Sequence, residues 1–308
     1  MGDPARRRAL SGPGSAGQGG PGPGRDPGAG RGPTRSDDLG ALIPPDLDAT
    51  IVFLRHGESV FIAEGRFQGQ LDTPLSPLGV RQADEAARRL AAPGRPPLLP
   101  VPAGPPLEIV HSPLARTSQT AERAAQAIRA VHGSATAPLR AEPGLIEIGQ
   151  GEWEGLRREE VAERYGDVLA GWRRAPLEVN APGGERVLDV AVRVRAALAA
   201  LLARLAAEPA TRPSATNVTG FPPPPAPDTP WTLLVGHDGV FKVALLTLLG
   251  FPLERFWSFP FALCGLSVVE LRAGMPVLRA HNLVEHLAPL LDERAIAETE
   301  ERQRSGAL

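Results

Sequence analysis

The chain has a single cysteine, Cys264, and a single lysine, Lys242, among its 308 residues. One cysteine cannot form an internal disulfide, so a disulfide framework is excluded and a cytoplasmic location is favoured. Cys264 lies in an apolar run, where we interpret it as a small buried hydrophobe. The arginines are scattered along the chain, so we interpret the scarcity of lysine as a compositional bias rather than a functional feature.

Long apolar runs and an excess of one charge are also missing. No apolar stretch reaches the roughly 18 residues that span a bilayer, so we expect no membrane segment. Arg6 to Arg8 are followed by glycine and proline rather than by an apolar segment, which argues against a secretory signal. The formal net charge is -2, and a balance so close to neutral predicts no nucleic-acid partner.

The distribution of glycine and proline divides the chain. Residues 1–47 have almost no large apolar side chains and predict a disordered tail, since they cannot bury enough surface to offset chain entropy. Residues 48–290 predict one catalytic domain, and residues 291–308 a charged carboxyl-terminal tail that begins as a solvated helix. Proline-rich stretches at 93–106 and 209–230 predict surface loops within the domain.

Between these breaks, short apolar runs alternate with helical patterns. Strands are predicted at 50–54, 107–110, 231–235, 265–271 and 276–281, and helices at 76–90, 112–131, 157–172, 185–207 and 239–249. Ser76-Pro77 and Ser112-Pro113 each supply a capping residue followed by a proline suited to a first helical turn. The alternation predicts an α/β fold, a three-layer α/β/α sandwich with a mainly parallel sheet.

Polar side chains follow three of these strands. Arg55 and His56 come after the first, Ser112 and Arg116 after the second, and His237 after a later one. Active sites of parallel sheets gather at the carboxyl ends of strands, so we expect these side chains to converge. Arginine forks and helix starts suit phosphate oxygens. The sequence therefore predicts a site for a dianionic tetrahedral group.

Six blocks that include these residues resemble one family, the histidine phosphatase superfamily, also called phosphoglycerate-mutase-like. Arg-His-Gly alone is a weak signal, but the blocks follow the family's order between about Thr50 and Leu287. They are Leu-Arg-His-Gly-Glu-Ser at 54–59, Gln-Gly at 68–69 with Asp-Thr-Pro-Leu-Ser at 72–76 and Gly79, Ser-Pro-Leu-Ala-Arg-Thr at 112–117 with Gln119-Thr120, Glu-Ile-Gly-Gln-Gly-Glu-Trp-Glu-Gly at 147–155, Pro-Gly-Gly-Glu at 182–185, and Val-Gly-His at 235–237.

The resemblance implies a phosphomonoester hydrolase of a small phosphorylated metabolite, metal-independent and without a cofactor. His56 would be the nucleophile that forms a phosphohistidine. Arg55, Arg116 and His237 would hold the phosphoryl oxygens in an in-line transition state. Glu147 would protonate the leaving oxygen and then activate the hydrolytic water.

The resemblance also places substrate contacts around the nucleophile loop. Gln68 and Gly69 would reach the pocket mouth, and Ser59 would shape the loop or touch the ligand. The chain departs from the family at Ile62, where related phosphatases often carry an asparagine that binds phosphate. Arg66 is a candidate replacement for that contact, with a solvated surface arginine as the alternative.

Three other functions stay open at this point. A phosphoglycerate-type mutase would return the phosphoryl group to a bound acid, although mutases tend to carry longer insertions than residues 155–182. A non-catalytic protein that binds a phosphorylated ligand has the Ile62 departure in its favour. A metallohydrolase could be built from His56, Glu58, His237 and Asp238, although no tight pair of the His-x-x-x-His kind is present.

Overall fold

The computed structural model describes residues 42–133, 137–208, 225 and 228–291. All of them belong to one unit of mutually contacting chain, residues 35–308. Most of the predicted tail at 1–47, nearly all of the tail at 291–308 and most of the loop at 209–230 lie outside the described residues. Their predicted states therefore remain predictions.

Six strands form one sheet in the order β3-β2-β4-β1-β5-β6. β1 to β4 run parallel to one another, and β5 and β6 join antiparallel at one side. This confirms the mainly parallel sheet. The strands are β1 Ala49–Arg55, β2 Glu108–His111, β3 Leu139–Ala141, β4 Trp231–Gly236, β5 Leu266–Arg272 and β6 Met275–Leu283.

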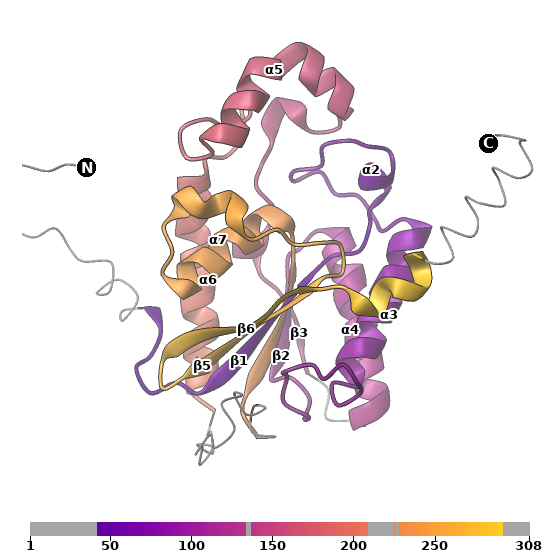
Figure 1. The fold of residues 1–308 in the computed structure, drawn as a ribbon, viewed down its shortest axis with the longest axis vertical. Helices are drawn as coiled ribbons and strands as arrows, with labels where there is room; N and C mark the ends of the chain where they lie inside the picture. The colour runs from indigo at the N-terminus through magenta and orange to yellow at the C-terminus, as the bar shows by residue number, and fades with distance from the viewer. Residues whose placement is uncertain (1–41, 134–136, 209–224, 226–227, 292–308) are drawn as a thin grey trace, which may run out of the picture. The chain divides into compact units, whose positions relative to one another are not determined.

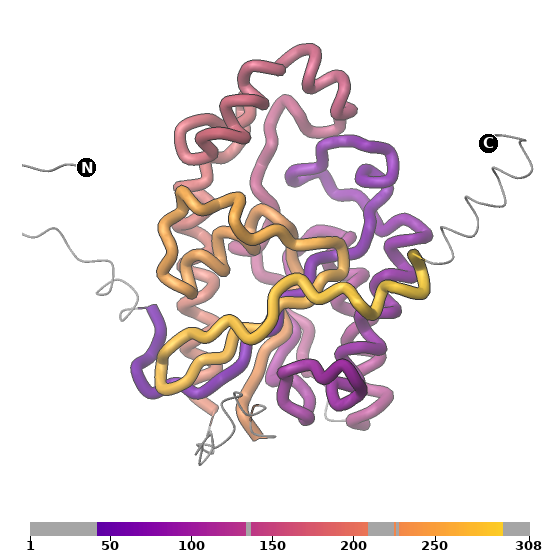
Figure 2. Tube along the Cα trace, viewed as in Figure 1, coloured from indigo at the N-terminus to yellow at the C-terminus, as the bar shows by residue number. Residues whose placement is uncertain are grey.

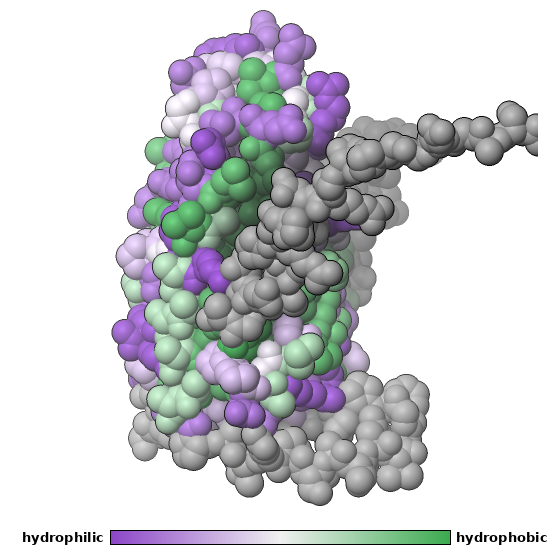
Figure 3. Space-filling view, turned by 90° about the vertical axis from the view of Figure 1, so that its left-hand side faces the viewer, coloured by the Kyte–Doolittle hydropathy of each residue, from purple (hydrophilic) through white to green (hydrophobic). Residues whose placement is uncertain are grey.

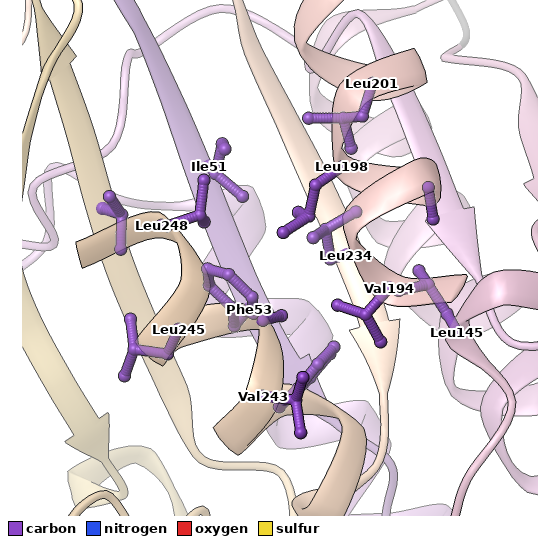
Figure 4. Packing of buried hydrophobic residues seen from close by; sticks show 14 of the residues in the cluster. Ile51, Phe53, Leu145, Val194, Leu198, Leu201, Leu234, Val243, Leu245 and Leu248 are labelled. Carbon is purple, nitrogen blue, oxygen red and sulfur yellow. The ribbon is translucent and has the colours of Figure 1, made fainter. Parts of the chain in front are cut away.

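Alternating side chains of the central strand build the cores on the two faces of the sheet. Ile51 and Phe53 join the core beneath α6 Val187–Ala206 and α7 Asp238–Leu249. Val52 and Leu54 join the core beneath α3 Pro77–Ala91 and α4 Ala115–His132. The helices lie in pairs on opposite faces, as Figure 1 shows, and Figure 4 shows the first core. The predicted three layers are confirmed.

A smaller part of the chain lies beyond the ends of the parallel strands. β1 leads through the loop 56–59 into α2 Val60–Ala63. α5 Arg158–Arg174 begins close to the end of α2, where the Arg158 N–H donates to the Gly65 carbonyl oxygen at 3.1 Å, and Figure 2 shows both helices at the same end of the chain trace. This part has its own apolar cluster around Trp153 and Val161. Short 3-10 helices complete the chain at Pro143–Leu145 (η1), Gly151–Trp153 (η2), Leu253–Ser258 (η3) and Glu285–Leu287 (η4).

Two sequence predictions need correction. Leu42, Ile43 and Leu47 are buried in the α6–α7 core, so the packed chain begins before residue 48. The glycine-rich composition upstream concealed these three apolar side chains. Ser112 does not cap a helix, because α4 begins at Ala115 and the Ser112 hydroxyl lies 2.8 Å from Nε2 of His237. Ser76 does cap α3, accepting the Gly79 N–H at 3.0 Å.

Apolar residues also reach the surface, as the view in Figure 3 shows. Phe251 and Trp257 are about half exposed, and Phe251 lines an open groove of about 370 Å³ with Leu177, Leu246 and Leu253. No residue lining this groove is among the site residues predicted from the sequence. Within the described part of the chain, no helix is long and apolar enough to cross a membrane.

Helix α6 offers a test of the packing. Leu198 is 1% exposed and lies close to Leu234 of β4 in Figure 4. Replacing Leu198 with alanine removes a buried side chain and leaves a cavity, so the free energy of unfolding should fall by about 3 kcal/mol in urea titrations. On the same helix, the 73% exposed Val192 is the control, and Val192→Ala should change it by less than about 0.5 kcal/mol. Equal effects would contradict the assigned faces.

Candidate active site

His56 directly follows β1 and is 2% exposed. Its Nδ1 lies 2.6 Å from the carbonyl oxygen of Gly57. A carbonyl can only accept, so Nδ1 carries the proton and Nε2 keeps a free lone pair. Burial, followed by the charges of Arg116 and Arg55, holds the pKa of His56 well below its ordinary value of 6.5. The imidazole is therefore neutral at physiological pH, as a nucleophile must be.

The loop after His56 is held by close backbone packing. A Cβ on Gly57 would lie 2.4 Å from the Gly79 carbonyl oxygen, and a Cβ on Gly79 only 1.8 Å from the carbonyl oxygen of Glu58. Glycine at both positions lets the loop lie against the start of α3. The Ser76 hydroxyl donates to the Glu58 carboxylate at 2.6 Å, so Glu58 anchors the loop to this helix.

Arg116 lies in the first turn of α4 and is fully buried. Its guanidinium donates to the carbonyl oxygens of Leu71 and Gly69, each at 2.9 Å. Burial lowers the pKa of Arg116 to about 10, so the side chain remains a cation at neutral pH. Gly69 adopts φ of 50°, and a Cβ there would overlap the Glu154 carboxylate. The 69–71 loop thus fixes the direction of the arginine.

His237 and Arg55 join His56 and Arg116 in one cluster of side chains. His237 is fully buried, its ring centroid lies 5.0 Å from that of His56, and burial with the charge of Arg116 lowers its pKa well below 6.5. Arg55 donates from NH1 to the Phe261 carbonyl oxygen at 2.5 Å. The structure therefore brings together all four residues that the sequence predicted as phosphate ligands and nucleophile.

Three polar atoms of this cluster are buried without a hydrogen-bond partner among the described residues. They are Nε of Arg55, Nε of Arg116 and Nδ1 of His237. Buried polar atoms are seldom left unpaired, so such atoms indicate a missing ligand. Two of them belong to guanidinium groups that can only donate, which favours an anion.

The Glu147 side chain contacts the first turn of α7, the helix that begins directly after His237. Its carboxylate accepts the N–H groups of Ile148 at 2.9 Å, Val240 at 3.1 Å and Gly239 at 3.2 Å. Its charge acts on Arg116, so the carboxylate lies near the cluster. The orphan N–H groups of a helix start suit a carboxylate at this position.

The sequence did not identify the side chains that hold the segment carrying Glu147. Arg193 of α6 donates to the carbonyl oxygens of Gly144, Ile146 and Glu147. Burial opposes ionisation of Glu185, but hydrogen bonds from Arg193, Gly149 and Gln70 outweigh it and lower the pKa of this carboxyl. The one sequence signal for this role of Arg193 was its position beside the apolar face of the predicted helix at 185–207.

The predicted substrate residues have other partners in the structure. The Gln68 side-chain oxygen accepts the hydroxyls of Ser59 at 2.5 Å and Thr73 at 3.1 Å. Ser59 also caps α2 by accepting the Ile62 N–H. Arg66 donates to the Glu64 carboxylate and the Gly155 carbonyl oxygen, each at 2.7 Å. A contact from Arg66 to phosphate in place of the missing asparagine therefore stays a prediction.

Among the described residues, no group of three or more His, Cys, Asp or Glu side chains is arranged to hold a metal ion. Comparison with known proteins agrees with the geometry of the cluster. Residues 51–210 and 225–284 match the model of the histidine phosphatase superfamily, branch 1.

Curated relatives include both hydrolases and a mutase. Phosphoserine phosphatase 1 of Hydrogenobacter thermophilus is 29% identical over 77% of this chain and 93% of its own length. Glucosyl-3-phosphoglycerate phosphatase of Mycobacterium tuberculosis is 35% identical over 67% of this chain and 78% of its own. A Proteus mirabilis protein named "Probable phosphoglycerate mutase GpmB" is 29% identical over 79% of this chain and 97% of its own.

Solved structures include a mycobacterial glucosyl-3-phosphoglycerate phosphatase complexed with VO3. It is 26% identical, and the match has a TM-score of 0.59 and covers 77% of this chain and 100% of that one. The residues that match the family model include His56, Arg116 and His237.

The buried neutral histidines predict a pH dependence of stability. In the unfolded chain His56 binds a proton as pH falls through about 6.5, whereas its lowered pKa keeps the folded form neutral. Its stabilising contribution is thus present above pH 6.5 and lost below it. Between pH 6 and pH 5, His56→Gln should reduce the slope of unfolding free energy by at most about 1.4 kcal/mol per pH unit, the value for one whole proton. Urea titrations in phosphate-free buffer measure this, and identical slopes in the two proteins would contradict it.

Proposed function

The chain belongs to the histidine phosphatase superfamily, and on that premise we propose that it hydrolyses small phosphate monoesters through a phosphohistidine on His56. One observation carries the proposal: Nδ1 of His56 lies 2.6 Å from the Gly57 carbonyl oxygen, so Nε2 is the free nucleophilic atom. The phosphatases among the relatives support the reaction class.

The first step transfers the phosphoryl group to the enzyme. The lone pair on Nε2 of His56 attacks phosphorus, the bond to the leaving oxygen breaks, and Glu147 supplies the proton that this oxygen takes up. Arg55, Arg116 and His237 hold the three remaining oxygens, which can accept hydrogen bonds from the unpaired Nε–H groups of the two arginines.

The second step releases phosphate. Water attacks phosphorus, the nitrogen–phosphorus bond breaks, and the Glu147 carboxylate takes the proton of the water. His56 returns to its neutral form with the proton still on Nδ1, which donates a hydrogen bond to the Gly57 carbonyl oxygen. In both proposed steps Glu147 supplies or takes up the proton, and the two arginines supply the positive charge beside the phosphoryl oxygens.

The substrate we propose is a phosphorylated small carboxylic acid or sugar acid. The names of three relatives refer to phosphoserine, phosphoglycerate or its glucosyl derivative, each a phosphate monoester that also carries a carboxylate. A screen of such esters, with sugar phosphates and nucleotide-like ribazole phosphate beside them, tests the class. Conversion of phosphoglycerate into its isomer without release of phosphate would favour the mutase instead.

The reaction is tested with p-nitrophenyl phosphate in the presence of a chelator. We expect turnover to persist in chelator and to be inhibited by vanadate. His56→Ala should lower kcat/KM by about 10³-fold or more, because it removes the atom that accepts the phosphoryl group. The control is His132→Ala at the end of α4, which should stay within about twofold.

Three outcomes would contradict this proposal in different ways. Turnover that survives His56→Ala would show that His56 is not the nucleophile. Loss of all turnover in chelator would favour a metallohydrolase. An unmodified protein that binds phosphate but hydrolyses no ester would favour the non-catalytic ligand-binding protein, in which Ile62 replaces a phosphate contact.

Glu147→Gln separates the two proposed proton transfers. The p-nitrophenolate ion leaves without a proton, so pre-steady-state mixing should show a burst equal to the enzyme concentration, followed by turnover slowed by about 10² to 10⁴. With phosphoserine, whose alkoxide needs a proton, the burst should disappear. Full turnover of both esters would refute the assigned role of Glu147.

A further inference from the structure

The one lysine of the chain is buried. Lys242 of α7 has a side chain 5% exposed, and its Nζ lies 2.5 Å from the Asp238 carboxylate one turn earlier. Asp238 directly follows His237 and is itself 30% exposed. A buried cation is seldom tolerated without a partner. The structure gives Lys242 such a partner in Asp238, so the presence of a lysine at this position has a structural reason beyond the composition of the chain.

The second oxygen of the Asp238 carboxylate has a different partner. It accepts the Phe261 N–H at 3.0 Å, and the carbonyl oxygen of the same residue accepts NH1 of Arg55 at 2.5 Å. One main-chain residue therefore joins the ion pair to the arginine beside the nucleophile. Phe261 is also buried against Phe53 and Phe241, so its backbone has few alternative positions.

Aromatic rings cover the other side of the lysine. Its Nζ lies 4.7 Å from the ring centroid of Trp257 and 5.4 Å from that of Phe256, both in η3. Trp172 of α5 packs edge-on against the same two rings, with centroids 5.6 Å and 5.7 Å away. The lysine therefore lies between Asp238 of its own helix on one side and the aromatic rings of η3, backed by α5, on the other.

From these contacts we propose that Asp238 and Lys242 form a positioning pair that orients Arg55 through the backbone of Phe261. NH1 is fixed on the Phe261 carbonyl oxygen, and the remaining guanidinium N–H groups, including the unpaired Nε, stay directed to the phosphoryl group. The inference deepens the proposed function and rests on it. One Asp238 oxygen is paired with the buried lysine and the other accepts the Phe261 N–H, so we assign this carboxylate a role in geometry and leave proton transfer to Glu147.

The first test compares single variants on p-nitrophenyl phosphate. Asp238→Asn should lower kcat/KM by about 10-fold or more, mainly through kcat, since small misplacements of a transition-state ligand are costly. Lys242→Met should have a similar effect, because it leaves Asp238 without its cation. Lys242→Arg retains the charge and should recover activity to within about threefold.

The second test is a double-mutant cycle with Arg55. If Asp238 acts through the arginine, Asp238→Asn should cost less than about twofold in an Arg55→Ala background. Additive losses would overturn the proposal. A loss larger for phosphoserine than for p-nitrophenyl phosphate would also overturn it, because it would mark Asp238 as a proton donor.

A matched control separates positioning from general loss of stability. Glu108 has a side chain 3% exposed and pairs with Arg204 and Arg140 at the start of β2. Glu108→Gln should lower the free energy of unfolding yet leave kcat/KM within about twofold. If it lowers kcat/KM as much as Asp238→Asn, the effect of Asp238 is general destabilisation and the proposal fails.

Failure of the proposed function would be visible separately. The cycle is interpreted only with an enzyme that turns over and that loses turnover in His56→Ala. The affinity for vanadate gives a second readout. Asp238→Asn should weaken this affinity in a protein that retains Arg55 and leave it unchanged in the Arg55→Ala background. An unchanged affinity in both backgrounds would overturn the positioning role while leaving the phosphohistidine intact.

Discussion

The site depends on one constraint: the buried Arg116, the half-buried Arg55 and two buried histidines meet at one point. Four cations together would repel one another strongly in a medium of low polarity. The structure avoids this by keeping both histidines neutral, since burial and the arginines depress their pKa values. The arginines remain charged, with their guanidinium groups bonded to main-chain carbonyl oxygens. In the proposed reaction an anion completes the arrangement, because it neutralises the remaining charge and accepts from the unpaired donors.

Much of this could be predicted from the sequence because the relevant signals are local. Strands of alternating or continuous apolar residues, and helices with one apolar face, have periods that a reader can count. The carboxyl ends of parallel strands then bring Arg55, His56, Arg116 and His237 together without knowledge of any contact. Short elements gave no such signal. β3 has three residues, all exposed, and α2 has four, too few to show a period.

The supports of the site could not be predicted, because each joins residues far apart in the chain. Arg193 reaches carbonyl oxygens of residues 144–147 from a helix 46 or more positions later. Ser112 looked like a helix cap, since a serine before a proline fits that role locally, yet its hydroxyl bonds to a histidine 125 positions away. Lys242 looked like an accident of composition for the same reason. Its partner Asp238 is near in sequence, but Phe261, whose N–H the same carboxylate accepts, is 23 positions beyond Asp238.

Two carboxylates lie at the start of α7, and their partners divide the work between them. Among the described residues, the hydrogen-bond donors to the Glu147 carboxylate are the backbone N–H groups of Ile148, Gly239 and Val240. Removing the Asp238 carboxylate would instead leave a buried lysine without its counter-charge, which costs about 3 to 5 kcal/mol where buried pairs are broken. The helix start therefore supplies one carboxylate that is held by main-chain N–H groups and one that is held by a buried side-chain cation. The proposed reaction needs both, since a proton carrier is useful only beside ligands that keep their positions.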